Sequence, residues 1–243
     1  MGWFTHWFGT RYYSLLYGHR DEQDAGAWVD MINRRWDLPH GAELMDLACG
    51  RGRHAKHFAS TGLRVTGIDI SEVSIGEARC AVPGTEFRVH DMRVPFATGR
   101  FDGICCLFTS LGYFDTLDDD RKVFAAVVEA LKPGGRFMLD FMNTELVLRD
   151  LVPAERLELE GVVFRIEREL VDDVIVKRVS VIDRGTEHRF EERVQALTPE
   201  QLERMAVDAG LIIEDRTDGP DPLPFDRQRS QRFVLWTRKP EVP

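Results

Sequence analysis

The chain alternates short apolar runs with longer amphipathic segments from Ala42 onward. Short runs rich in Val, Ile, Leu and Phe are typical of buried strands, and the segments between them have the periodicity of surface helices. This alternation indicates βαβ units and predicts a mainly parallel sheet. The expected strands are residues 43–48, 63–70, 86–90, 101–108 and 136–141, and the expected helices between them are residues 52–60, 72–80 and 118–131.

The pattern changes after Asn143. Residues 156–170, 174–183 and 187–197 alternate Val, Ile and Phe with Glu and Arg, and turn residues separate the segments. Alternation at every second position is typical of antiparallel strands with one face in water, so we expect a β-meander here.

Helix signals return near the carboxyl end, where Thr198, Pro199 and Glu200 provide an N-cap, a first-turn proline and a first-turn acid. Gly210 ends this predicted helix, and strands are expected at 211–217 and 233–238 with a Pro-rich loop over 218–229. We divide the chain into an amino-terminal helical lid (1–40) and a main domain (41–243) that contains the meander as an insertion (144–197). The lid is expected to carry Trp3, Trp7, Tyr12, Tyr13, Tyr17 and Trp28 on one or two amphipathic helices.

Composition narrows the class of protein. With 43% hydrophobic and 30% charged residues, the chain is too apolar for a disordered protein and too charged for a membrane protein. Its formal net charge of -9 and the lack of a dense Lys/Arg tract disfavour nucleic acid as a partner. No apolar stretch approaches the ~20 residues of a membrane-spanning helix, so no membrane partner is expected. The cysteines at 49, 80, 105 and 106 form no C-x-x-C pair, which favours reduced thiols and a cytoplasmic protein.

The strongest chemical signal is segment 44–54, in which a strand runs into a glycine-rich turn that opens a helix. Small residues at Ala48, Gly50 and Gly52 let the backbone approach a ligand and expose the amino end of the helix. Asp69 ends the next strand, where a carboxylate can accept hydrogen bonds from both hydroxyls of a ribose. These positions together predict a ligand that contains a nucleoside.

Two features discriminate between nucleoside cofactors. The spacing A-x-G-x-G differs from the G-x-G-x-x-G of NAD-binding turns, and Asp46 stands where it would repel a pyrophosphate. A cofactor with a cationic group near this carboxylate fits better. S-adenosylmethionine carries both a sulfonium and an α-ammonium, so we favour it over NAD.

Five motifs follow one another along the chain: Asp46-Leu47-Ala48-Cys49-Gly50-Arg51-Gly52, Asp69, His90-Asp91-Met92-Arg93, Phe101-Asp102 and Leu131-Lys132-Pro133-Gly134-Gly135. With these motifs the chain resembles the class I S-adenosylmethionine-dependent methyltransferases. The segment 108–114 and the meander resemble the small-molecule branch of that family, which includes amino-sugar and glycine N-methyltransferases. The resemblance implies an α/β fold: a Rossmann-like, doubly wound, seven-stranded, mainly parallel sheet with an antiparallel last strand, and an antiparallel meander inserted after the fifth strand.

The resemblance also implies where the methionyl part of the cofactor would bind. The backbone of Ala48, Cys49, Gly50 and Gly52 would face it, and Asp46 would lie near its ammonium. The neighbouring side chains at 51, 53 and 54 are not explained by the motif and are interpreted as solvated.

The nucleoside part would use residues from the next strands. Asp69 would hold the ribose, and Ile70 would pack on the adenine. Asp91 would accept a hydrogen bond from the adenine amine, and the Met92 amide would bond to the ring. Phe108, just past the fourth strand, would lie near the reactive methyl group.

The acceptor side must position a nucleophile, exclude water and help to remove a proton, because methyl transfer is an in-line displacement. The candidates are Tyr113, Tyr17, Tyr13 and Asn143. Tyr113 follows the fourth strand at the carboxyl edge of the sheet, where open α/β sheets place their ligands. Tyr13 and Tyr17 would belong to the lid, although packing explains an aromatic residue at Tyr17 equally well.

The sequence therefore predicts an enzyme that methylates N or O of a small-molecule acceptor. A methyltransferase acting on a protein or tRNA is an alternative, as is an interaction module that keeps the fold without catalysis. No metal site is expected, since His54 and His57 lack a Cys, Asp or Glu partner at a suitable spacing. The surface of the meander suits either a roof over the site or a homodimer interface.

Overall fold

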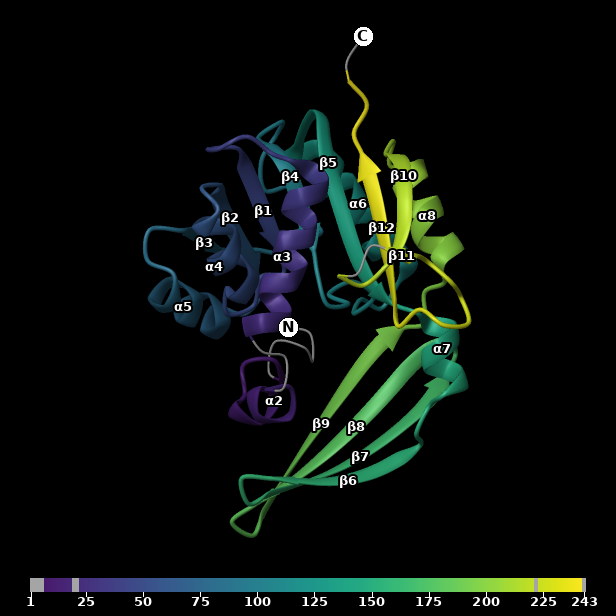
Figure 1. Cartoon of the computed structure of the whole chain (residues 1–243). Helices are drawn as coiled ribbons and strands as arrows, with labels where there is room; N and C mark the ends of the chain where they lie inside the picture. Colours follow the sequence, from purple (N-terminus) through teal and green to yellow (C-terminus); the bar gives the residue numbers. More distant parts are fainter. Residues whose placement is uncertain (1–6, 19–21, 221–222, 242–243) are drawn as a thin grey trace.

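The computed structural model describes residues 7–18, 22–220 and 223–241, so Trp3 lies outside the described residues (Figure 1). None of the helices in these ranges is long and apolar enough to cross a membrane. The helices are α2 (Arg11–Leu16), α3 (Glu22–Trp36), α4 (Arg53–Ser60), α5 (Glu72–Ala81), α6 (Leu117–Ala130), α7 (Thr144–Arg149) and α8 (Pro199–Asp208). The strands are β1 (Glu43–Leu47), β2 (Arg64–Asp69), β3 (Glu86–Val89), β4 (Phe101–Cys106), β5 (Leu131–Met142), β6 (Ala154–Leu159), β7 (Val162–Val171), β8 (Val174–Asp183), β9 (Thr186–Gln195), β10 (Ile212–Asp218), β11 (Leu223–Pro224) and β12 (Arg232–Arg238).

The main sheet is 8-stranded, with the order β11-β10-β12-β5-β4-β1-β2-β3. Strands β1 to β5 pair in parallel, whereas β12 runs antiparallel between β5 and β10. The Rossmann-like fold with an antiparallel last strand is thus confirmed, and the short β11 is one strand more than expected. The carboxyl ends of β1 and β4 lie side by side at the point where the strand order reverses, which is where such sheets bind ligands.

Local signals explain where the helices begin. The hydroxyl oxygens of Ser71, Thr116 and Thr198 cap α5, α6 and α8 by accepting a hydrogen bond from a backbone N–H of the first turn. The run Asp118–Asp120 occupies the first turn of α6, where negative charge is favourable. The predicted boundaries of these helices are therefore close to the observed ones.

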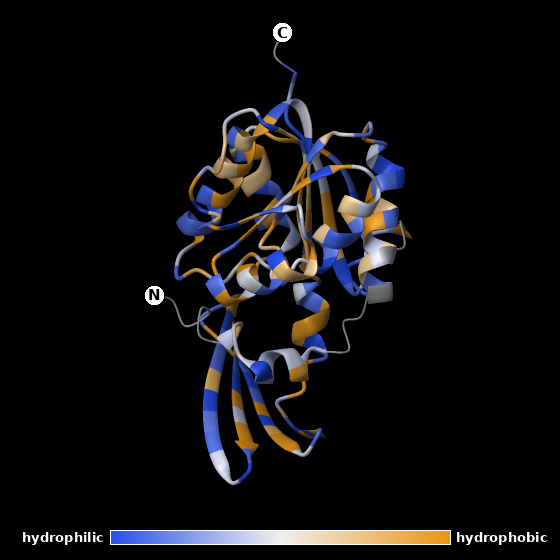
Figure 2. Ribbon diagram, turned by 90° about the vertical axis from the view of Figure 1, so that its left-hand side faces the viewer, coloured by the Kyte–Doolittle hydropathy of each residue, from blue (hydrophilic) through white to orange (hydrophobic). Residues whose placement is uncertain are grey.

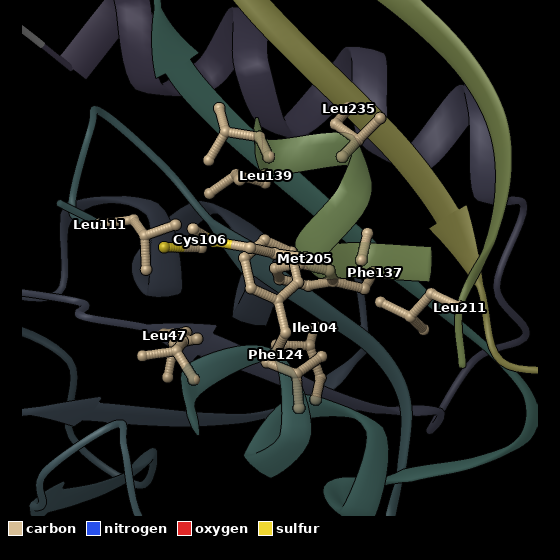
Figure 3. Packing of buried hydrophobic residues seen from close by; sticks show 14 of the residues in the cluster. Leu47, Ile104, Cys106, Leu111, Phe124, Phe137, Leu139, Met205, Leu211 and Leu235 are labelled. Carbon is tan, nitrogen blue, oxygen red and sulfur yellow. The ribbon is translucent and has the colours of Figure 1, made fainter. Parts of the chain in front are cut away.

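Helices cover both faces of the main sheet. Side chains from α3, α4 and α5 pack on one face, and side chains from α6 and α8 pack on the other. The adjacent residues Cys105 and Cys106 of β4 point to opposite faces, so each belongs to a different core. Figure 3 shows Cys106 packed with Phe124 of α6 and Met205 of α8. The cysteines of β4 are core residues, as their apolar setting predicts.

The meander forms a second sheet with the order β6-β7-β8-β9, all antiparallel, which extends away from the main sheet (Figures 1 and 2). One face packs on α2, where Trp7 and Leu16 contact buried side chains of β7 and β8. Exposed positions alternate with more buried ones along much of β7 and β9, so the other face is polar, and Figure 2 shows hydrophilic and hydrophobic residues interleaved along these strands. The predicted meander is therefore confirmed, with one face packed on a helix.

Some boundaries differ from the expectation. The segment 156–170 is not one strand, because Glu160 and Gly161 form a two-residue turn with φ of 49° and 77° between β6 and β7. β5 begins at Leu131 rather than at residue 136, and the short helix α7 was not predicted.

Candidate active site

A cavity of about 370 Å³ lies at the carboxyl ends of β1 and β4. Its wall combines the turns after β1, β2 and β3, the loop after β4, the start of α4, and α2. Segments far apart in sequence thus meet at the predicted edge of the sheet. The predicted site residues in the wall are Tyr13, Tyr17, Asp46, Ala48, Cys49, Gly50, Asp69, Ile70, Asp91, Met92, Phe108 and Tyr113.

Two of the site residues proposed from the sequence do not line the cavity. Gly52 has a φ of 79°, and a Cβ there would lie 3.0 Å from the ring of Phe87, so this glycine permits close packing of the turn rather than contact with a ligand. Asn143 is buried and its Nδ2 donates to the carbonyls of Arg227 and Ser230 at 2.8 Å each. It fixes the loop before β12 and does not line the cavity.

The turn after β1 has left-handed backbone at the cavity. Ala48 has a φ of 60° and Gly50 has a φ of 54°. Glycine adopts this conformation freely, whereas alanine is strained by about 1–2 kcal/mol. The Cys49 N–H donates to the carbonyl of Ile68 at 2.9 Å and fixes the turn against β2. Burial raises the pKa of the Cys49 thiol, which therefore stays protonated.

Asp46 lines the cavity with a carboxylate of which one oxygen has no partner among the described residues. It is 1% exposed, and its Oδ2 has no hydrogen-bond partner among the described residues. Burial raises its pKa from 3.8 to about 7, although the Ala55 N–H lowers the pKa. A buried carboxylate oxygen without a partner is costly unless a cation meets it. Asp46 therefore fits a ligand with a cationic group, such as the ammonium of S-adenosylmethionine.

Two more carboxylates stand in the wall, each already oriented by a neighbour. Asp69 accepts hydrogen bonds from the Gly50 N–H at 2.9 Å and the Ser71 N–H at 2.8 Å. Burial raises the pKa of Asp69 in spite of these donors. Asp91 binds the guanidinium of Arg93, with Nη2 at 2.6 Å from Oδ2, and this bond lowers the pKa of Asp91. A ligand amine at Asp91 would therefore share that carboxylate with Arg93.

Phe108 forms the wall between the sheet and α4. Its ring stacks on His54, with 5.2 Å between centroids, and the guanidinium of Arg53 lies 4.7 Å from its centroid. His54 is buried, and burial lowers its pKa to about 3, so the imidazole is neutral. The interpretation of residues 53 and 54 as solvated is wrong. Their place in the first turn of a helix behind a ligand-binding turn was the signal that could have identified them.

Aromatic rings form the wall on the side of α2. Phe8 lies edge-on to Tyr13 at 5.0 Å and to Tyr113 at 5.4 Å between centroids, and Tyr13 contacts Tyr17 at 4.7 Å. This brings together the three tyrosines proposed from the sequence, which lie on α2, at its carboxyl end and on the loop after β4. Phe8 was not predicted, since nothing in the sequence places it opposite Tyr113.

A buried polar network anchors α2 to the second sheet. Glu192 of β9 accepts hydrogen bonds from Trp7 Nε1 at 2.5 Å and from Tyr17 Oη at 2.9 Å. Lys177, its cross-strand neighbour on β8, donates to Tyr17 Oη. Burial, with the nearby Glu192 carboxylate, raises the pKa of Tyr17 well above its usual value. Tyr17 is thus a protonated phenol held by the insertion and is not suited to accept a proton.

Comparisons with known proteins give the family. A protein-family model described as "Methyltransferase domain" matches residues 44–135. The chain is 32% identical over 213 residues to a dTDP-3-amino-3,6-dideoxy-alpha-D-glucopyranose N,N-dimethyltransferase of Streptomyces fradiae, which covers 83% of this chain and 80% of that protein. It is also 32% identical over 127 residues to a dTDP-3-amino-3,4,6-trideoxy-alpha-D-glucopyranose N,N-dimethyltransferase of Streptomyces venezuelae, covering 51% of this chain and 52% of that protein.

The fold is shared with a solved structure. The crystal structure of an S-adenosylmethionine-dependent methyltransferase from Clostridium acetobutylicum superposes with a TM-score of 0.80 at 23% identity, over 94% of this chain and 96% of that one. The sequence identity to the Streptomyces fradiae enzyme covers most of both proteins, and the cavity lies where the strand order of the sheet reverses. This chain belongs to the class I S-adenosylmethionine-dependent methyltransferases.

Proposed function

We propose that the protein transfers a methyl group from S-adenosylmethionine to a nitrogen or oxygen atom of a small-molecule acceptor. The observation that carries this proposal is the cavity itself. An unsatisfied buried carboxylate oxygen, that of Asp46, lines it from the sheet, and the rings of Phe8, Tyr13 and Tyr113 line it from the opposite elements. A cationic cofactor and an enclosed acceptor both fit such a wall.

The methionyl part of the cofactor would bind to polar groups at the carboxyl end of β1. Asp46 would meet the α-ammonium, and the backbone of Ala48, Cys49 and Gly50 would face the methionyl part. The left-handed φ angle at Ala48 supports this, because strained backbone is common where a loop wraps a ligand.

The nucleoside would lie along the ends of β2 and β3. Asp69 would accept hydrogen bonds from the ribose hydroxyls, in the orientation already fixed by the Gly50 and Ser71 amides. Ile70, which is exposed in the cavity, would pack on the adenine. Asp91 and the Met92 amide would recognise the edge of the ring, with Arg93 keeping Asp91 ionised.

When bound, the cofactor supplies a methyl group on a positively charged sulfur that leaves readily. The chain must then align the acceptor, exclude water and take up a proton where the acceptor carries one. Phe108 would border the reactive methyl group. Tyr113 and Tyr13 would contact the acceptor, and Tyr17 would orient it through a hydroxyl fixed by Glu192 and Lys177.

Residues 1–40 are proposed to act as a lid over this site. In the described part, α2 supplies the aromatic wall and α3 packs on the sheet, with Trp28 5.8 Å from Phe108 between centroids. A lid that encloses the acceptor favours a small molecule over a protein or tRNA. The amino-sugar dimethyltransferases among the relatives favour a primary or secondary amine as the first class of acceptor to test.

The cellular compartment and the oligomeric state of the enzyme are proposed from its thiols and its surface. Free cysteines at 49, 80, 105 and 106 favour a reducing compartment such as the cytoplasm. The polar face of the insertion sheet is available for a homodimer, which light scattering of the purified protein would detect.

The experiment that tests the function is calorimetric titration of the purified protein with S-adenosylmethionine and S-adenosylhomocysteine, with NAD as the control ligand. We expect the first two to bind and NAD not to bind. Methyl transfer from labelled cofactor to a panel of amine and hydroxyl metabolites then identifies the acceptor. A folded protein that binds neither of the first two ligands would refute the enzyme proposal and support an interaction module instead.

A further inference from the structure

The loop after β4 is strained at the point where it enters the cavity wall. Phe108 and Thr109 have φ of 59° and 56°, in the left-handed region that residues with a Cβ rarely adopt. Consecutive left-handed residues other than glycine persist only where their surroundings hold them. The structure must therefore contain the groups that hold this pair.

A buried carboxylate on the neighbouring strand holds both amides. Asp140 of β5 is 0% exposed, and its Oδ2 accepts the Phe108 N–H at 2.7 Å. Its main-chain carbonyl accepts the Thr109 N–H at 3.1 Å. One residue thus satisfies the amide of each strained position.

An arginine on the last strand completes the arrangement. Arg232 Nε donates to Asp140 Oδ1 at 2.7 Å, and its Nη2 donates to Thr109 Oγ1 at 2.9 Å. The planar guanidinium therefore fixes both the carboxylate and the strained residue, which a lysine could not do with the same geometry. The pairing also compensates the buried charge of Asp140.

We propose that Asp140 and Arg232 are positioning residues for methyl transfer. They hold the backbone of Phe108 and Thr109 in the left-handed conformation, and this keeps the Phe108 ring stacked on His54 in the cavity wall. Neither is among the described residues that line the cavity, so both act through Phe108. The activity readout rests on the proposed function, whereas the free energies of unfolding of the variants do not.

The first comparison uses Arg232→Met and a matched control on the same strand. Arg238 also lies on β12 and pairs with Glu214 at 3.2 Å, so Arg238→Met removes an arginine ion pair without touching the Phe108 loop. We expect Arg232→Met to lower kcat by about tenfold or more, since small displacements of positioning groups have effects of this size. The Kd of S-adenosylmethionine should change by less than about threefold. Arg238→Met should retain the kcat of the unmodified protein.

A second substitution tests the strain directly. Glycine adopts positive φ without strain, so Thr109→Gly in the Arg232→Met background should recover most of the lost kcat. Thr109→Gly alone removes the Arg232 hydrogen bond together with the strain at this position, so its kcat is the reference for the rescue. Because Arg232→Met removes the positive charge that compensates the Asp140 carboxylate, the same rescue is repeated in Asp140→Asn/Arg232→Met, in which residue 140 is neutral.

The proposal is overturned if Arg232→Met keeps normal kcat, or if glycine at 109 recovers nothing in either background. A purely structural role would lower the melting temperature and leave kcat per cofactor-binding site unchanged. Failure of the proposed function would look different, since the unmodified protein would then transfer no methyl group. In that case the free energies of unfolding decide: Thr109→Gly must stabilise the Arg232→Met protein more than the unmodified one, and equal effects refute the inference.

Discussion

Replacing Asp46 by asparagine should have opposite effects on the stability of the ligand-free protein and on cofactor binding. Asp46 is 1% exposed, and its Oδ2 lacks a partner among the described residues. Burial raises its pKa from 3.8 to about 7, so the ionised form is disfavoured in the folded protein relative to the unfolded chain. The same ionised form is the one that a cationic cofactor needs.

The size of the stability effect follows from the pKa difference. About three units at ~1.36 kcal/mol each give about 4 kcal/mol of lost stability above pH 7. Because the folded pKa is raised, this loss is absent below pH 3.8 and grows as the pH rises to about 7. Asparagine stays neutral but its buried amide still loses contact with water. We therefore expect Asp46→Asn to raise the free energy of unfolding by about 2 kcal/mol at pH 8. For a chain of this size this raises the melting temperature by about 4–8 °C.

Binding should change in the other direction. Loss of a buried charge partner should weaken the binding of S-adenosylmethionine to Asp46→Asn by about a hundredfold. For the unmodified protein, Kd should rise about tenfold per unit as the pH falls below about 7, because Asp46 must release a proton. The asparagine variant should lack this pH dependence. Titrations stay below about pH 7.5, since α-amino groups lose their charge near pH 8.

The assays are thermal unfolding of the ligand-free protein at pH 4 and pH 8, and calorimetry with S-adenosylmethionine between pH 5.5 and 7.5. The reasoning is refuted if Asp46→Asn is less stable than the unmodified protein at pH 8. An unchanged Kd in the variant would equally remove Asp46 from the cofactor site.

Three further substitutions test other parts of the molecule. Asp69→Ala should weaken S-adenosylmethionine binding by at least about tenfold in calorimetry, since charged hydrogen bonds to the ribose are lost, and unchanged affinity would end that assignment. Tyr113→Phe should leave this affinity intact and slow methyl transfer by about tenfold in a turnover assay, and a variant of normal rate would exclude the hydroxyl from the mechanism. Gly67→Ala should lower the free energy of unfolding in urea by about 1–3 kcal/mol, because its Cβ would lie 2.5 Å from the Phe87 ring. Gly76→Ala, whose Cβ meets nothing within 4 Å, is the matched control and should not destabilise the protein.

The convergence of residues 46–50, Asp69 and Asp91 at one edge of the sheet could be predicted because it depends on local signals. A glycine-rich turn ends one strand, and acids follow the next two strands, at Asp69 and Asp91. Since parallel strands end at one edge of a sheet, these positions had to converge once the strands were identified. The structure places them in one cavity wall. Of the residues predicted to bind the cofactor, Gly52 alone does not line the cavity, because its α-carbon packs close to the ring of Phe87.

The contacts that hold the tyrosine side of the cavity could not be predicted, because they join distant parts of the chain. Glu192 binds Tyr17 across 175 positions, and Lys177 does so across 160. Their meeting depends on the register of β8 on β9 and on how α2 lies against that sheet. A one-residue shift of register would send each side chain to the opposite face. The prediction that the side chains of residues 53 and 54 are solvated was wrong. Polar side chains are usually solvated, and the sequence does not show that Phe108 stacks on these two.

The attachment of α2 to the insertion has a consequence for recombining this enzyme with its relatives. Trp7 and Tyr17 flank α2, and both bond to the same carboxylate, Glu192, which is 7% exposed. A chimera that received a foreign insertion but kept its own first residues would bury these polar groups without partners. Segments 7–18 and 154–195 are therefore one exchangeable unit, although more than a hundred positions separate them. We expect a transfer of acceptor specificity to require both segments together, with the turn after β1 left in place.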